Sequence, residues 1–126
     1  MTGETILVVE DEGLIALHLV ELLEDAGYRV TAPAYSGEMV LRALEKSPVP
    51  DLILMDVGLA GTLDGIETAR QIRQRFSIPL IFITAHTSNH MLERMREVAP
   101  DGIVIKPFVR DNLLALIEKT VARPSA

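Results

Sequence analysis

Four short apolar runs of this sequence each end at residues that can do chemistry. These residues are Glu10, Asp11 and Glu12 after the first run, Asp56 after the second, Thr84 at the end of the third and Lys106 after the fourth. If the runs are parallel strands, their carboxyl ends meet at one edge of a sheet, where open α/β folds bind ligands. Carboxylates brought close together repel one another and are seldom tolerated without a cation. The pattern therefore predicts a site for magnesium, which prefers oxygen ligands.

Each residue of this set has a distinct expected role. Asp11 and Asp56 are expected to bind magnesium directly, and Glu10 through a water molecule. Lys106 would neutralise the remaining negative charge and pair with an anionic group, while the hydroxyl of Thr84 would donate to a phosphoryl oxygen. Such a set suits phosphoryl transfer, in which positioning and charge neutralisation do most of the catalytic work.

Simpler explanations exist for each residue taken alone. Asp11 and Glu12 could cap a helix that follows them, and Lys106 could be a surface lysine beside a turn. The coincidence on four strand ends favours a shared site instead. His18 and His90 have no second ligand at a suitable spacing, so we expect them to be surface residues.

The apolar runs alternate with segments of helical periodicity. The expected strands are Thr5 to Val9, Arg29 to Tyr35, Leu52 to Met55, Leu80 to Thr84 and Ile103 to Ile105. The expected helices are Leu14 to Ala26, Gly37 to Leu44, Ile66 to Phe76, Met91 to Val98 and Val109 to Val121. Because the runs lack polar alternation, both faces of these strands should be covered, which indicates a parallel sheet between two layers of helices.

Prolines and capping residues refine this arrangement. Pro33 cannot donate to a strand ladder, so the second strand is expected at a sheet edge. Ser36 should cap the second helix and Asp64 the third. The first helix has more apolar residues than one core stripe requires, so some of them should reach solvent or a partner.

Length and composition narrow the class of protein. The 126 residues fit one domain, residues 1–126, and because Arg123-Pro124 does not continue a helix comfortably, we expect any output domain to be absent from this chain or to have been removed. A net charge of −6 argues against direct nucleic-acid binding. The chain has no cysteine and no apolar run of membrane-spanning length, so we expect a cytoplasmic protein without a membrane segment.

Taken together, the motifs resemble the receiver domain of bacterial response regulators over essentially the whole chain. The matching stretches are Ile6 to Glu12, Asp51 to Asp56, Asp64-Gly65, Ile83 to Ala85 and Lys106 to Phe108. The resemblance implies a flavodoxin-like, doubly wound sheet of five parallel strands in the order 2-1-3-4-5, flanked by five helices. It also implies that a histidine kinase or a histidine phosphotransfer protein phosphorylates Asp56 with magnesium bound.

The resemblance assigns further roles. It implies a cis peptide bond between Lys106 and Pro107, a magnesium ligand in the backbone carbonyl of Gly58, and a signalling hydroxyl on Thr84. It also allows a homodimer through helix four, strand five and helix five.

Three departures from the family bear on regulation. The loop from Val57 to Leu63 lacks the usual proline and is one residue longer than the commonest form. His86 replaces more usual residues near the path of the attacking water, which would alter the phosphoryl lifetime. Ile103 stands where many receivers carry an aromatic ring that rotates inward, so we expect Ile103 to stay largely buried in both states.

Two other functions fit parts of this pattern. An aspartate-nucleophile phosphatase usually has a second acid two residues after the nucleophile, and Gly58 occupies that position, so we do not expect an enzyme. An interaction module that resembles a receiver but works without phosphorylation is the remaining alternative, and the intact set of acids, Thr84 and Lys106 argues against it.

Overall fold

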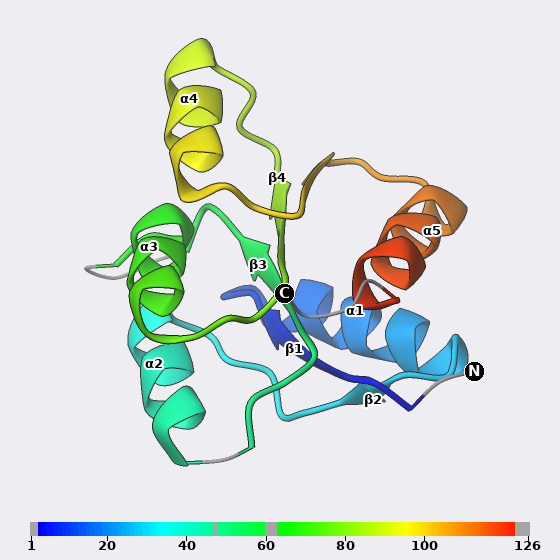
Figure 1. Cartoon of the computed structure of the whole chain (residues 1–126). Helices are drawn as coiled ribbons and strands as arrows, with labels where there is room; N and C mark the ends of the chain where they lie inside the picture. The colour runs from blue at the N-terminus through cyan, green and yellow to red at the C-terminus, as the bar shows by residue number, and fades with distance from the viewer. Residues whose placement is uncertain (1–2, 47, 60–62, 123–126) are drawn as a thin grey trace.

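A computed structural model describes residues 3–46, 48–59 and 63–122, in which strands and helices alternate along the chain (Figure 1). The strands are β1 (Thr5–Val9), β2 (Arg29–Val30), β3 (Leu52–Asp56), β4 (Leu80–Thr84) and β5 (Gly102–Ile105). The helices are α1 (Gly13–Asp25), α2 (Gly37–Lys46), α3 (Gly65–Arg75), α4 (Asn89–Val98) and α5 (Arg110–Val121). The expected elements are thus present, most with ends within two residues of the prediction.

The five strands form one parallel sheet in the order β2-β1-β3-β4-β5, as predicted. Side chains alternate between its faces: Leu7 and Val9 of β1 pack with α2, α3 and α4, whereas Ile6 and Val8 pack with α1 and α5. The two helical layers of Figure 1 follow this division. Burial of both faces explains why the central strands are continuous apolar runs.

The second strand is much shorter than predicted. It comprises only Arg29 and Val30, and pairing with β1 resumes at an isolated bridge between Ala34 and Val9. Pro33 lies between these two points and supplies no donor to the ladder, which explains the interruption. The predicted edge position of β2 is confirmed.

The expectation that both faces of every strand are covered was wrong for β5. Ile103 and Val104 are only half-buried, and 48% of Ile105 is exposed. This strand is the opposite edge of the sheet, so helices cover it incompletely.

Helix caps agree with the sequence at two of three positions. Ser36 Oγ accepts a hydrogen bond from the amide of Met39, and Asp64 Oδ1 accepts one from the amide of Glu67. At α1 the capping residue is Glu12, but its side chain makes no capping hydrogen bond. The acidic residues before α1 are therefore not explained by a side-chain cap from Glu12.

Within the described residues, no helix is both long and apolar enough to cross a membrane. The tail from residue 123 onward lies outside the described part of the chain.

Candidate functional site

The ends of β1 and β3 bring three carboxylates together. Val9 pairs with Met55 in the sheet, so the next residue on each strand, Glu10 and Asp56, lies at the same edge. Glu10, Asp11 and Asp56 each offer an oxygen within 4.8 Å of the others. Three oxygen donors at this spacing fit a hard divalent cation of the kind the sequence predicts. In the part of the chain that is described, neither His18 nor His90 joins such a group.

Glu10 is the most deeply buried member of this group, with 1% of its surface exposed. Burial raises its pKa from 4.5 to about 7, and the nearby charge of Asp56 contributes to the rise. The Glu12 amide opposes this by donating to Glu10 Oε2 at 3.1 Å. A buried acid beside a second acid is unfavourable unless a cation compensates it. The electrostatics therefore favour a bound cation.

Lys106 supplies a positive charge to the same edge. Its Nζ lies 3.3 Å from Glu10 Oε1 and 3.7 Å from Asp56 Oδ1, and its side chain is mostly buried. The amide of Lys106 donates to the carbonyl of Thr84 at 2.8 Å, which fixes β5 beside β4 at this point. The Lys106–Pro107 peptide bond is cis. The ammonium is thus placed to pair with an anion held on Asp56.

Thr84 lies buried at the end of β4 and is bound to the loop that follows. The His86 amide donates to Thr84 Oγ at 2.8 Å, and the hydroxyl lies 3.4 Å from the His86 carbonyl. The His86 imidazole lies close to Gly58 in the loop after β3, because a methyl group added at Gly58 would lie 3.4 Å from His86 Nε2. The Gly58 amide donates to Asp56 Oδ1 at 3.3 Å. Gly58 therefore lies beside the Asp56 carboxylate and the His86 ring lies beside Gly58, whereas residues 60–62 of the loop after β3 lie outside the described part.

Ile103 lies within β5 and not at the acidic edge. It pairs with Phe82 in the sheet and packs against the core shared by α2, α3 and α4. The residue is half-buried, so the expectation that it is largely buried was only partly correct. The edge position of β5 accounts for the difference.

Two residues near the site had no functional role in the sequence analysis. Gly65 lies so close to Asp56 that an added methyl group would come 2.2 Å from the Asp56 carbonyl oxygen. Arg94 of α4 donates to Asp64 Oδ2 at 3.0 Å. No local pattern reveals this second contact, because its partners are 30 residues apart.

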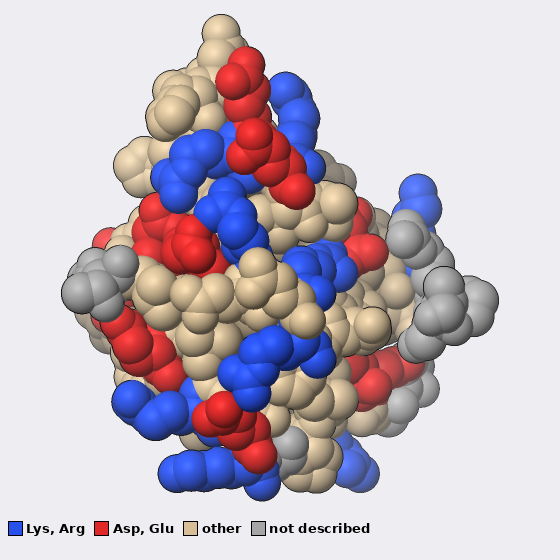
Figure 2. Space-filling model, turned by 60° about the vertical axis from the view of Figure 1, so that its left-hand side comes forward, with Lys and Arg blue, Asp and Glu red and all other residues tan. Residues whose placement is uncertain are grey.

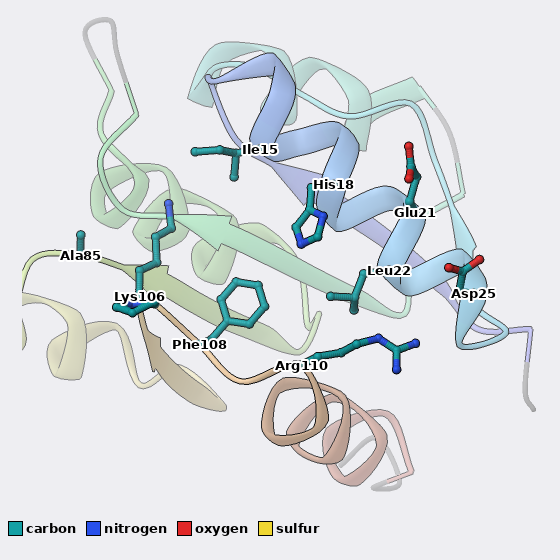
Figure 3. A pocket seen from close by; sticks show the side chains of 10 residues that line it. Ile15, His18, Glu21, Leu22, Asp25, Ala85, Lys106, Phe108 and Arg110 are labelled. Carbon is teal, nitrogen blue, oxygen red and sulfur yellow. The ribbon is translucent and has the colours of Figure 1, made fainter.

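A groove of about 730 Å³ extends from Lys106 between α1 and α5 (Figure 3). Its apolar floor includes Ile15, Leu22 and Phe108, and Glu21 and Asp25 line it on the α1 side. Beyond the groove, α1 exposes Leu14 by 85% and Leu17 by 53%. The predicted excess of apolar residues on the first helix is thus present at the surface.

The helical layer formed by α2, α3 and α4 carries both acidic and basic side chains on its surface. Figure 2 shows acidic and basic side chains interspersed over the side of the molecule that carries α2, α3 and α4. Several of them form ion pairs between helices, such as Arg75 with Glu45 and Arg94 with Asp64.

Comparisons with known proteins agree with the fold. Residues 6–118 match the family model of the response regulator receiver domain. The chain is 33% identical over 118 residues to the transcriptional regulatory protein PdtaR of Mycobacterium tuberculosis, covering 94% of this chain and 57% of that protein. It is 34% identical over 125 residues to ResD of Bacillus subtilis, covering 98% and 51%. The chain therefore spans about half the length of the curated relatives it matches.

Solved structures give the same answer. The receiver domain of the sensor histidine kinase PA1611 from Pseudomonas aeruginosa, with a magnesium ion in its active-site cleft, has a TM-score of 0.86 and 30% identity, covering 97% of this chain and 100% of that one. A receiver domain of a diguanylate cyclase from Desulfovibrio desulfuricans has a TM-score of 0.88 and 35% identity, covering 96% and 95%. With the acidic edge, Thr84 and Lys106 arranged as described, the chain belongs to the response regulator receiver domains of two-component systems.

Proposed function

We propose that Asp56 accepts a phosphoryl group from a phosphohistidine of a histidine kinase or a histidine phosphotransfer protein, and that this state controls partner binding. One observation carries the proposal: the carboxylates of Glu10, Asp11 and Asp56 lie within 4.8 Å of one another, with the Lys106 ammonium beside two of them. Such a cluster is costly for a domain that uses it only as structure.

In the proposed reaction, a carboxylate oxygen of Asp56 forms a bond to phosphorus while the bond from phosphorus to the histidine nitrogen breaks. The product is an acyl phosphate and a free imidazole. Lys106 would pair with a phosphoryl oxygen, and the Thr84 hydroxyl would donate to another. Magnesium held by Asp11, Asp56, Glu10 and the Gly58 carbonyl would neutralise negative charge on the reacting group.

The kinase or phosphotransfer protein would dock on the exposed apolar part of α1 and the adjoining groove. Leu14 lies close in sequence to the acidic edge and is 85% exposed, while the groove runs from Lys106 along α1. Exposed apolar side chains of this kind are typical of protein interfaces. A helix of a kinase bundle is the partner we propose for this surface.

Other properties follow from the same assignment. We place the domain in the cytoplasm, as a signalling module and not an enzyme with a turnover substrate, and we expect no direct DNA binding. A homodimer through α4, β5 and α5 would cover Ile105 and Val109, which are 48% and 62% exposed. The domain can act alone or as part of a larger regulator, as in relatives that are about twice its length.

Acetyl phosphate provides a direct test, because a small acyl phosphate needs the assembled site but no docking partner. We expect a single phosphoryl adduct by intact-mass analysis in the presence of magnesium, and none on Asp56→Asn. Asp51→Asn is the matched control, since Asp51 lies at the other end of β3, where its Oδ2 accepts a hydrogen bond from the Thr5 amide. An adduct on the Asp56 variant would refute the assignment. A parent protein that stays unmodified would favour an interaction module that works without phosphorylation.

A further inference from the structure

We propose that the ion pair between Arg94 and Asp64 is a latch that couples the phosphorylation state of Asp56 to the position of α4. The inference rests on the proposed function, because it needs Asp56 to change its chemical state. It adds a route that runs through the first turn of α3 and not through Thr84 or Ile103. The device has two contacts and an anchor, each visible in the structure.

The first contact joins Asp56 to the start of α3. The Gly65 amide donates to the Val57 carbonyl at 3.0 Å. A methyl group on Gly65 would come 2.2 Å from the Asp56 carbonyl oxygen and 2.8 Å from the Val57 Cα. With backbone packed this tightly against backbone, the first turn of α3 cannot move independently of the end of β3.

The second contact is made by Asp64, whose two carboxylate oxygens have different partners. Oδ1 accepts from the Glu67 amide at 2.8 Å and caps α3, while Oδ2 accepts from Arg94 Nη2 at 3.0 Å. The cap orients the carboxylate, so a shift of the α3 N-terminus displaces the oxygen that Arg94 binds. About a third of each side chain is exposed, with 37% for Asp64 and 29% for Arg94.

The third feature is an anchor at the other end of α4. Arg73 of α3 donates to the carbonyl of Ala99, directly after α4, at 3.1 Å and to Asp101 Oδ2 at 3.2 Å. The same Asp101 oxygen accepts from the Leu80 amide at the start of β4, at 2.8 Å. The C-terminal end of α4 is thus tied to both α3 and the sheet. Release of the Arg94 contact would let the N-terminal part of α4 move about that anchor.

An ion-pair latch is consistent with the presence of Ile103 at the position where many receivers carry an aromatic ring that rotates inward. Ile103 is β-branched, so its χ1 is restricted, and it has no ring to swing between two environments. A weak ion pair is suited to a switch because partly exposed pairs contribute little. Breaking it should raise amide exchange in the first turns of α4 by roughly two- to fivefold.

Hydrogen exchange with and without magnesium and beryllofluoride, a phosphoryl mimic, tests the latch. The variants are Arg94→Gln and Asp64→Asn, and the asparagine keeps an oxygen for the helix cap. Arg96→Gln makes the same charge change on the same helix, and Glu97→Gln removes a neighbouring 3.9 Å ion pair between α3 and α4. We expect the mimic to raise amide exchange over residues 89–95 in the parent and both controls. In the two latch variants this rise should be less than about half of the rise in the parent, while the response of residues 85–88 is retained.

Fluorine NMR on the same samples shows whether the beryllofluoride adduct forms. This measurement separates a failure of the latch from a failure of the proposed function of Asp56. If the adduct forms and Arg94→Gln responds like the parent over residues 89–95, the latch is refuted while the proposed function stands. The latch is also refuted, and the proposed function again stands, if the adduct forms on the parent but amide exchange in α4 does not change. If no adduct forms on the parent, the proposed function fails and the latch fails with it.

Discussion

Replacing Glu10 by glutamine should stabilise the metal-free domain, and increasingly so as the pH rises. Burial raises the pKa of Glu10 from 4.5 to about 7. A carboxyl whose folded pKa is raised contributes stability that is fully present below pH 4.5 and is lost as the pH rises through about 7. The rise of about 2.5 pH units corresponds to about 3 kcal/mol over the whole range, of which about 2 kcal/mol lies between about pH 5.5 and pH 8.

Urea unfolding in the presence of a chelator measures this effect. Because glutamine does not titrate, the difference between the variant and the parent isolates the contribution of Glu10. We expect the variant to gain about 2 kcal/mol relative to the parent between about pH 5.5 and pH 8. Glu12→Gln is the matched control, since Glu12 is exposed and its side chain makes no capping hydrogen bond. Its curve should run parallel to that of the parent.

Magnesium should narrow this difference in stability at high pH. An ion that binds only the folded state stabilises it, and a carboxylate ligand binds in its ionised form. The parent should therefore gain more stability from magnesium at about pH 8 than Glu10→Gln does. Parallel pH profiles of parent and variant without metal would refute the reasoning, because they would show that Glu10 ionises at its ordinary pKa.

Three further predictions concern other parts of the site. Asp11→Ala should lose the magnesium-dependent NMR shifts at the strand ends, and a titration like that of the parent would exclude Asp11 as a ligand. Gly65→Ala should lower the free energy of unfolding by at least about 2 kcal/mol by overpacking, whereas Gly13→Ala, with open space around it, should be neutral or slightly stabilising in thermal unfolding. Methyl NMR with beryllofluoride should show changes centred on residues 85–90 and little rotamer change at Ile103, and the opposite pattern would make Ile103 the switch.

The sequence predicts the sheet well because its central strands are buried on both faces. Leu52 to Met55 is an apolar run with no polar alternation, and such a run fits a strand between two helical layers. The errors lie at the two edges of the sheet. Pro33 interrupts β2, and the edge strand β5 leaves Ile103 half-buried, since burial at an edge depends on the helices that pack nearby.

The site is predictable for a related reason: residues at the ends of parallel strands share one edge of the sheet. That rule brings Asp56 and Lys106 together although they are far apart in the sequence. The rule does not predict burial. Glu10, which was expected to act through water, is the most buried acid of the site, and its carboxylate is closer to the Lys106 ammonium (3.3 Å) than the Asp56 carboxylate is (3.7 Å). Nor does it predict contacts between helices, such as that of Arg94 with Asp64, because these depend on where two helices pack.

The two ends of the proposed route are held with different strength, and this difference decides its direction. The start of α3 is packed backbone against backbone on the end of β3, whereas a partly exposed ion pair such as that of Arg94 contributes about 1 kcal/mol or less. A change of charge on Asp56 would displace the end of β3 and the start of α3 together. Gly65 transmits the resulting shift with little loss, because its backbone is packed directly against that of Asp56. The ion pair between Arg94 and Asp64 would therefore break before the backbone contact at Gly65 does. The N-terminal part of α4 would then move, while the hydrogen bonds of Arg73 hold its C-terminal end in place.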